Sequence, residues 1–458
     1  MKAVVCGAGQ VGFAIAKQLA EEQVDVTVID REAELVQRIA DQLDVRATCG
    51  HASHPDVLER AGIGEADMLV AVTHTDEVNM IACEIAHALF KVPIKIARVR
   101  AQSYLQGEWA ELFSNKALPI DVIISPEIEV ARAAMRRLDV PGAFDMIPFA
   151  DDRIRVVGLR IGAGCPVKDT PLRQLSELFP DLHITVMGIF RGERVIAPDG
   201  EDQMLVGDEI YFAAEKEHVP RAMTAFGVEQ RATRRVVVLG GGNIGRFLAR
   251  QIEAEHPEVV AKLIEADKRR ADAIAETLSR TVVLHGDALD REVLIEANAH
   301  HAEACIAVTN DDGVNILASL LAKREGCQRA IALVNGQSYG PMVGGLGLDA
   351  VISPRGITVS TILQHIRRGR VRKLQALRDG AAEVVEVEAL TTSPLVGKPL
   401  REVDLPDGIV LGALLRGKQV VVTRADTVVE AGDRIVLFAT SEAKRQVDKL
   451  FAVRLEFF

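Results

Sequence analysis

Short apolar runs alternate along this chain with amphipathic stretches of about a dozen residues. Six predicted strands occupy its first part: Ala3–Cys6, Val24–Asp30, Val45–Gly50, Met68–Val72, Ile94–Val99 and Val122–Ile124. Between the first two, Ile15 and Leu19 lie one helical turn apart, which is typical of an amphipathic helix. Strands that alternate with helices predict a parallel, doubly wound sheet.

The same pattern occurs a second time. Its predicted strands are Val236–Leu239, Val259–Glu265, Thr281–Gly286, Cys305–Val308, Ala330–Val334 and Ala350–Ile352. Self-similarity of this kind indicates a duplicated structural unit. We therefore expect an α/β protein with two tandem Rossmann-like, doubly wound parallel sheets.

A smaller module of short strands and glycine turns follows each predicted sheet. Helices near Ile128–Leu138 and Thr358–Arg368 lead into the two modules, in which Val206–Phe212 matches Ala431–Leu437. The order is sheet, module, sheet, module. The predicted domains are residues 1–125, 126–228, 232–353 and 354–458.

Composition excludes several functional classes. Apolar residues make up 48% of the 458 positions, but no apolar run is long enough to span a bilayer, so we expect a soluble, cytoplasmic protein. A net charge of −11 and 4% aromatic residues argue against a nucleic-acid partner. The six cysteines lack metal-ligand spacing, so we expect reduced thiols and no metal site.

A glycine fingerprint, G-x-G-x-x-G, joins the first strand to the first helix in both copies. The first glycine permits the turn, the second lets the backbone approach a pyrophosphate, and the third lets helix and strand pack closely. One copy alone is weak evidence, but two matching copies are stronger. The predicted nucleotide cradles comprise Gly7, Gly9, Gln10, Val11 and Gly12, and Gly240, Gly242, Asn243, Ile244 and Gly245.

An acidic residue ends the second strand of each copy. Asp30 lies 18 positions after Gly12, and Glu265 lies 20 positions after Gly245. A carboxylate there accepts hydrogen bonds from a ribose and repels a 2′-phosphate, which favours NAD(H) over NADP(H). Arg31, beside Asp30, weakens that preference. Alternatively, each acid simply lies at a solvated strand end.

The third strands end where an adenine would lie, at His51 and Asp287. Asp287 can accept a hydrogen bond from the adenine amine, whereas His51 can donate or accept. We hypothesise that the second half favours NAD more strictly and that the first tolerates other adenine nucleotides. His51 is equally well explained as a surface turn residue.

Thr73 and Thr309 follow the fourth strands, each with an acid three positions later. That spacing predicts a capping box at a helix start, and the same hydroxyl could also reach a ribose or phosphate. In the first half alone, Arg98 and Arg100 lie at the end of the fifth strand. A guanidinium suits phosphate, and a surface salt bridge is the alternative.

Catalytic machinery is not evident in the sequence. A hydride-transfer enzyme normally adds a sizeable substrate domain with a proton donor, whereas the small modules share no His or Lys between their copies. We therefore expect nucleotide sensing. An NAD-dependent oxidoreductase, or a sensor acting on a partner other than a transporter, remains the alternative.

Four features of the chain carry a resemblance to one family. They are the modular order, the opening Met1–Gly12, the repeated Thr-x-x-Asp-x-x-Asn after the fourth strands and the Gly-Asp turns of both modules. In these features the chain resembles the TrkA family, whose members are tandem RCK (KTN) proteins of Trk-type potassium uptake systems. The resemblance implies no enzyme activity, binding of NAD(H) and of ATP or ADP, and a homo-oligomeric ring, for which we expect a tetramer. It also implies docking on a Trk-type membrane potassium transporter, with the chain peripherally associated with the inner face of the cell membrane.

Carried over by position, the resemblance assigns nucleotide contacts in both halves. They are Gly7, Gly9, Gly12, Asp30 and Arg98 in the first, and Gly240, Gly242, Gly245, Glu265 and Asp287 in the second. His51 stands where the family commonly has an acid. This departure puts the adenine contact of the first site in question.

Overall fold

The computed structural model describes residues 1–105, 109, 112–113, 117–179, 182–229, 232–336, 339, 346–366 and 371–451. The chain divides into two compact units. One comprises Met1–Glu129 with Pro354–Ile366, and the other comprises Val130–Ser353 with Arg367–Phe458. The predicted α/β class with two parallel sheets and two small modules is confirmed.

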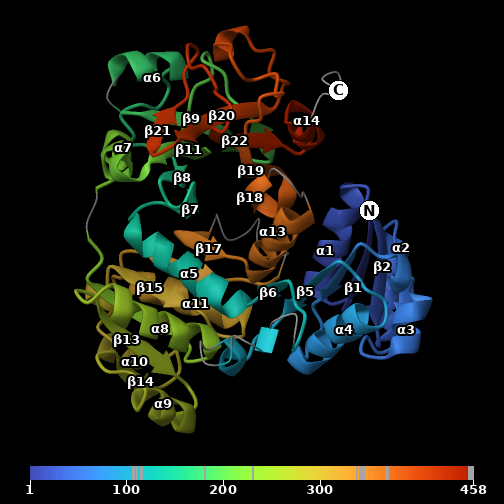
Figure 1. Cartoon of the computed structure of the whole chain (residues 1–458). Helices are drawn as coiled ribbons and strands as arrows, with labels where there is room; N and C mark the ends of the chain where they lie inside the picture. The colour runs from blue at the N-terminus through green and yellow to red at the C-terminus, as the bar shows by residue number, and fades with distance from the viewer. Residues whose placement is uncertain are drawn as a thin grey trace. The chain divides into compact units, whose positions relative to one another are not determined.

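The first parallel sheet forms most of the first unit (Figure 1). Its strand order is β3-β2-β1-β4-β5-β6. Its strands are β1 (Lys2–Cys6), β2 (Asp25–Asp30), β3 (Arg46–Cys49), β4 (Met68–Ala71), β5 (Ile94–Arg98) and β6 (Val122–Ile124). The helices are α1 (Gln10–Glu21), α2 (Ala33–Gln42), α3 (Pro55–Arg60), α4 (Asp76–Ala88) and α5 (Pro126–Asp139). The chain reverses its direction of winding between β1 and β4, so the carboxyl ends of these two strands flank a crevice position suited to ligands.

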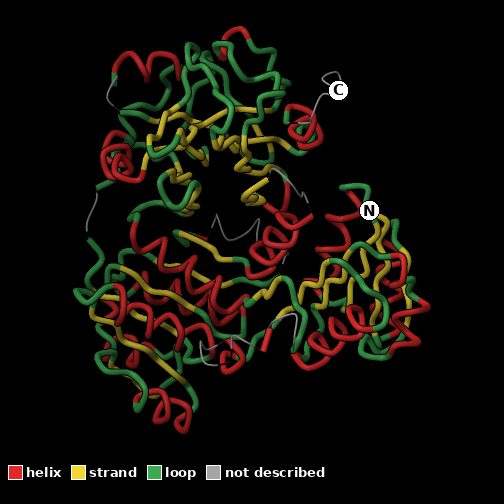
Figure 2. The backbone as a smooth tube through the Cα atoms, in the orientation of Figure 1, coloured by secondary structure: helices red, strands yellow, loops and turns green. Residues whose placement is uncertain are grey.

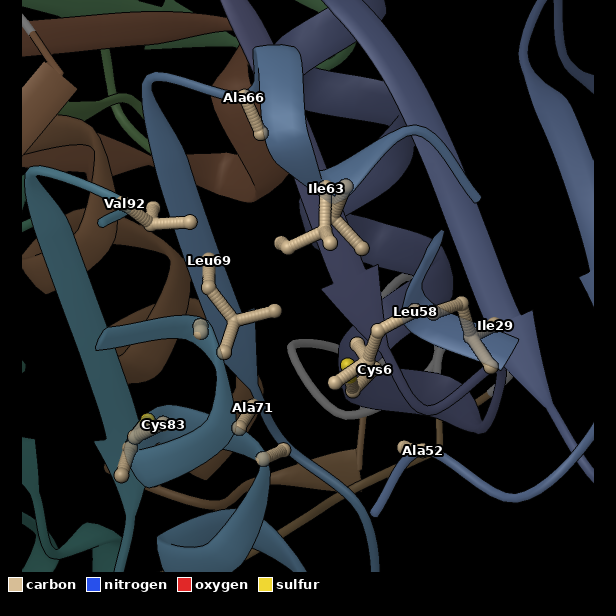
Figure 3. Close-up of a cluster of buried hydrophobic side chains, with 14 of the residues drawn as sticks. Cys6, Ile29, Ala52, Leu58, Ile63, Ala66, Leu69, Ala71, Cys83 and Val92 are labelled. Atoms are coloured by element: carbon tan, nitrogen blue, oxygen red, sulfur yellow. The ribbon is translucent and has the colours of Figure 1, made fainter. Parts of the chain in front are cut away.

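A close-packed core lies between this sheet and its helices (Figure 3). Cys6 of β1, Ile29 of β2 and Leu69 of β4 are each fully buried, and Leu58 of α3 packs with them. These are the residues of the apolar strand runs, which explains why the sequence pattern predicted this sheet. The core fixes β1 and β2, whose carboxyl ends carry the first glycine turn and Asp30.

The second parallel sheet repeats the order, β14-β13-β12-β15-β16-β17. Its strands are β12 (Arg235–Leu239), β13 (Val260–Glu265), β14 (Val282–His285), β15 (Ala304–Ala307), β16 (Ala330–Leu333) and β17 (Ala350–Ile352). The helices are α8 (Asn243–Glu255), α9 (Lys268–Ala275), α10 (Arg291–Glu296), α11 (Asp312–Arg324) and α13 (Pro354–Ile366).

The helix that follows each parallel sheet in sequence belongs wholly or mostly to the other compact unit. Helix α13 follows the second sheet in sequence but packs against α1 in the first unit (Figure 1). Helix α5 follows the first sheet, but its residues Val130–Asp139 belong to the second unit. Each sheet domain is therefore completed by a helix that the other half supplies.

Both small modules lie in the second unit and are mainly antiparallel sheet (Figure 2). The first has β7 (Asp145–Phe149), β8 (Ile154–Arg160), β9 (Ile184–Arg191), β10 (Arg194–Ile196), β11 (Glu209–Glu215), α6 (Leu172–Leu178) and α7 (Val219–Ala225). The second has β18 (Val371–Leu377), β19 (Ala382–Glu388), β20 (Ile409–Arg416), β21 (Gln419–Val422), β22 (Arg434–Thr440) and α14 (Lys444–Leu450). One hydrophobic core contains residues of both modules, including Phe190, Tyr211 and Phe438.

The helices that the structure describes are all too short or too polar to cross a bilayer.

Candidate functional site

The first glycine turn forms as its sequence predicts. Gly7 has φ +111°, a backbone conformation that side chains disfavour, and it directs the chain from β1 towards α1. A side chain on Gly12 would overlap the Gly7 carbonyl oxygen, so the close helix–strand contact requires glycine. A Cβ added to Gly9 would meet no described atom within 4 Å. Gly9 therefore borders open space.

The second turn has the same construction. Gly240 has φ +100°, a side chain on Gly245 would overlap the Gly240 carbonyl oxygen, and a Cβ on Gly242 would meet no described atom within 4 Å.

Each glycine turn leads directly into a helix whose first turn is open. Gly9 and Gly242 are the N-cap residues of α1 and α8, and neither provides a side-chain hydrogen bond. Gln10 and Asn243 are exposed at the helix starts, and Val11 and Ile244 are half-buried behind them. The first-turn N–H groups have no intrahelical partners and lie at the positive end of the helix dipole, and neither first turn contains an acid. Such an end suits a diphosphate.

The two acids lie against the glycine turns. Asp30 Oδ2 accepts the Ala8 N–H at 2.6 Å, and Oδ1 accepts the Glu32 N–H at 3.0 Å. Glu265 Oε2 accepts the Gly241 N–H at 2.8 Å, and Oε1 accepts the Asp267 N–H at 2.8 Å. In both halves the carboxylate is thus fixed beside the turn, where the sequence placed a ribose acceptor.

Arginines approach these acids differently in the two halves. Arg31 is exposed and pairs with Glu32 at 3.2 Å. Arg38 of α2 donates to the Ala8 carbonyl at 3.2 Å. Arg270 of α9 instead approaches the acid itself, with Nη1 3.5 Å from Glu265 Oε1. Glu265 is also buried, whereas Asp30 is half-buried.

The predicted capping box at Thr73 and Thr309 is wrong. The N-cap residues of α4 and α11 are Thr75 and Asp311, two positions later in each copy. A capping residue must directly precede the first helical turn, and the two threonines lie too early for that. Their hydroxyls donate instead to the Oδ1 atoms of Asn79 and Asn315, at 2.7 Å in both copies.

Asn79 and Asn315 are positioning residues that the sequence reasoning did not single out. Asn79 is fully buried, and its Nδ2 donates to the carbonyls of Thr73 and Arg98. Asn315 likewise donates to Thr309 and Leu333. Each amide therefore ties the end of the fourth strand to the end of the fifth. The repeated Thr-x-x-Asp-x-x-Asn spacing was the signal for it.

The aspartates of the same motif fix the next loop. Asp76 Oδ2 accepts the N–H groups of Arg100 and Ala101, and Asp312 accepts those of Asn335 and Gly336. The loop after the fifth strand is consequently held at the carboxyl edge of each sheet.

Arg98 and Arg100 have different environments. Arg100 Nε donates to Glu127 Oε1 at 2.7 Å, which is the salt bridge that was the alternative to a phosphate contact. Arg98 is half-buried, and its buried Nε has no hydrogen-bond partner among the described residues. Burial lowers the pKa of this guanidinium. An anion would satisfy its unpaired donor.

The two adenine candidates make only local contacts. His51 Nδ1 lies 2.8 Å from Ser53 Oγ, and the His51 ring packs 5.0 Å from that of His54. Asp287 is exposed, and its Oδ1 accepts the Leu289 N–H at 2.9 Å. Each acid thus contacts its glycine turn, whereas among the described residues neither adenine candidate contacts that acid or that turn directly.

Two family models match this chain. The TrkA-N domain model matches residues 3–126 and 236–354, which contain the two parallel sheets. The TrkA-C domain model matches residues 156–227 and 384–452, within the two small modules. Together they cover well over half of the sequence.

Full-length relatives carry one shared name, Trk system potassium uptake protein TrkA. The protein from Azorhizobium caulinodans is 52% identical over 458 residues, and the protein from Halomonas elongata is 41% identical over 462 residues; both matches cover 100% of each chain.

Solved structures agree on the fold. A structure described as the GsuK channel has a TM-score of 0.62 at 18% identity and covers 99% of this chain and 79% of that chain. Another, described as the GsuK channel bound to NAD, has a TM-score of 0.60 at the same identity and coverage.

Proposed function

Because this chain belongs to the TrkA family of potassium-uptake proteins, we propose that it is a nucleotide-sensing regulatory subunit of a Trk-type potassium uptake system. It binds NAD(H), and also ATP or ADP, at its two glycine turns. It converts the nucleotide state of the cell into opening or closing of a membrane potassium channel or transporter.

The observation that carries this proposal is the duplicated open turn. No described atom lies within 4 Å of a Cβ built at Gly9 or Gly242, and each turn adjoins a helix start without a side-chain cap and a fixed carboxylate. The residues present therefore fit a dinucleotide. The diphosphate would be held by the N–H groups at the starts of α1 and α8, and the ribose by Asp30 and Glu265.

Further contacts differ between the halves. In the first, the unpaired Nε of Arg98 suits a phosphate, and His51 faces the adenine with a donor or an acceptor. In the second, Asp287 accepts from an adenine amine, and Thr309 adjoins the sugar-phosphate edge. The structure described as the GsuK channel bound to NAD supports this assignment through a shared fold.

The proposal assigns no catalytic activity to the chain. Each glycine-turn domain is followed in sequence by a small antiparallel module, where a hydride-transfer enzyme would present a substrate domain. The protein acts as a homo-oligomeric ring, a tetramer, at the inner face of the cell membrane beneath its Trk-type partner. The predicted domain boundaries, residues 1–125, 126–228, 232–353 and 354–458, belong to this proposal.

Potassium flux in vesicles that contain the Trk membrane subunit tests it. Flux measured with the full-length chain should change on addition of NAD, NADH, ATP or ADP. Gly9→Ala and Gly242→Ala should weaken that response, because the added methyl occupies the cradle without disturbing the fold. Gly162→Ala is the matched control, since that glycine also borders open space but lies in a small module.

Potassium flux that none of the four nucleotides changes would contradict the proposal. The chain would instead be an oxidoreductase if it oxidised NADH with a carbonyl substrate and Asp30→Ala abolished that turnover. A nucleotide response that is retained in solution with a partner other than a transporter would favour the remaining alternative, a sensor that acts on such a partner.

A further inference from the structure

Arg329 lies immediately before β16, at the amino edge of the second parallel sheet. Its guanidinium donates three hydrogen bonds within the second unit. Nε reaches the Glu303 carbonyl at 3.4 Å, Nη1 reaches the Arg137 carbonyl at 3.2 Å, and Nη2 reaches Thr233 Oγ1 at 2.6 Å. Burial lowers the pKa of Arg329, so this placement is maintained against a desolvation penalty.

Two of these contacts concern the C-terminal turn of α5. The carbonyls in the last turn of a helix lack intrahelical partners. Arg329 satisfies the carbonyl of Arg137, and the Thr233 hydroxyl donates to the carbonyl of Leu138 at 3.3 Å. A cation at a helix C-terminus is also favoured by the helix dipole. Arg329 and Thr233 together cap α5 from the second nucleotide domain and its preceding linker.

The opposite end of α5 is held at the first nucleotide domain. Glu127, in the first turn, accepts Arg100 Nε at 2.7 Å, and the main chain of Arg100 is fixed by Asp76 at the carboxyl edge of the first sheet. Helix α5 has 14 residues, with Glu127 near its start and Arg137 and Leu138 in its last turn. Ala330 and Lys95 occupy equivalent positions in the two sheets, because the N–H group of each donates to an aspartate carboxylate. The residue of the first half that corresponds to Arg329 is therefore Ile94. The arginine cap is therefore a feature of one half.

We propose that Arg329 is a positioning residue that couples the two nucleotide sites of one chain through α5. A ligand at the first site biases the loop that holds the start of α5, and the Arg329 cap makes the second domain respond to the position of the same helix. Two sites that bias one shared element are thermodynamically coupled. This inference rests on the proposed nucleotide binding, and it adds communication between the sites.

Calorimetric titration of the full-length chain with NAD measures the coupling. Asp30→Ala leaves the second site to be titrated alone, and Glu265→Ala leaves the first. We define the coupling factor as a ratio. Its numerator is the product of the two association constants of the unaltered chain, and its denominator is the product of the two single-site constants. We expect it to differ from one by about fivefold or more. In Arg329→Gln the coupling factor should become one, while both single-site association constants stay unchanged.

Thr233→Val provides an independent variant, because it removes one hydroxyl from the cap and leaves Arg329 in place; it should bring the factor closer to one. Arg291→Gln is the control, since Arg291 pairs with Glu325 on the surface of the same domain. A factor of one in the unaltered chain, or a factor that neither Arg329→Gln nor Thr233→Val changes, would overturn the inference. Absence of NAD binding in the unaltered chain would overturn the proposed function and the coupling with it.

Discussion

The two glycine turns hold their acids in the same way with different side chains. In the first, Asp30 bonds the N–H of Ala8, and in the second the longer Glu265 bonds the N–H of Gly241. A Cβ on Gly241 would lie 2.6 Å from Ile274 Cδ1 and 2.9 Å from Glu265 Oε2. The extra methylene of glutamate is thus accommodated by the smaller neighbour. The position of the carboxylate is common to both halves, and its means of support is not.

The far side of each site differs in charge. Arg98 ends β5 in the first half and Arg100 lies two residues beyond it; Asn79 and Asp76 hold their backbone. The residues held by the equivalent asparagine and aspartate in the second half are Leu333 and Asn335. Arg100 pairs with Glu127, but the Nε of Arg98 has no partner among the described residues, and Leu333 takes the place of Arg98 in the second half. An unpaired guanidinium donor in the first half alone favours a stronger phosphate preference at the first site.

The largest expected effect tests what the halves share. Gly12→Ala and Gly245→Ala each force a methyl group onto a carbonyl oxygen, and we expect each to destabilise its domain by about 3 kcal/mol or more. Thermal unfolding with parallel NAD titration checks this, and each variant should lose the site of its own half. Gly162→Ala should change neither. Full stability and two sites in Gly12→Ala would contradict the geometry of the turn.

Truncation of the buried asparagines comes next. Asn79→Ala and Asn315→Ala leave buried main-chain groups without partners, which should cost about 2 kcal/mol in each half. Urea unfolding measures both. Because the two hydrogen-bond networks match, we expect the losses to agree within about 0.5 kcal/mol. A clearly unequal pair would show that the two polar frames are not equivalent.

Changes to Glu265 and to the neighbouring residue 241 sharpen the comparison between the two turns directly. Gly241→Ala should destabilise the second half by about 1–2 kcal/mol, because the methyl meets Ile274 and Glu265. Adding Glu265→Asp should recover part of that loss, so the double variant is more stable than the sum of the single changes predicts. A double-mutant cycle from denaturant unfolding measures this coupling. Strict additivity would refute the compensation between residue 241 and the acid.

The smallest expected effect depends on pH. Burial raises the pKa of Glu253, but N–H groups of Arg280, Ser279 and Thr281 outweigh it and bring the pKa to about 2, from an ordinary 4.5. Since the folded state lowers the pKa, the carboxylate stabilises the fold above about pH 4.5, and this contribution disappears as the pH falls towards 2. Ala20 occupies the matching position in α1, so only the second half has this anchor.

Glu253→Gln should therefore reduce stability by about 1 kcal/mol at pH 7, after allowance for solvent screening. The difference from the unaltered chain should shrink as the pH is lowered through 4.5. Denaturant unfolding at a series of pH values measures it, with the exposed Glu276→Gln as control. A difference that persists undiminished in acid would exclude the carboxylate as its source.

The sequence predicted the elements that local pattern determines. Apolar runs such as Ala3–Cys6 became buried strands, and Gly7 and Gly240 adopted the positive φ that their turns require. The acids Asp30 and Glu265 lie beside the turns because β2 and β13 are the hydrogen-bonded neighbours of β1 and β12.

Features that depend on tertiary partners could not be predicted in this way. An amphipathic pattern identifies α13 as a helix but does not specify that α1 of the other half covers it. Thr73 was assigned to a cap because its spacing from Asp76 fits a capping box, but the chain enters α4 two residues later. Arg329 carries no local motif at all; its partners in α5 and the linker lie far away in sequence.

The central claim is that the two glycine turns are separate nucleotide sites, and calorimetric titration with NAD tests it most directly. The full-length chain should bind two NAD per chain, and Asp30→Ala and Glu265→Ala should each bind one, with Gly162→Ala unchanged at two. A chain that binds fewer than two, or an acid variant that retains both sites at unaltered affinity, would contradict the claim.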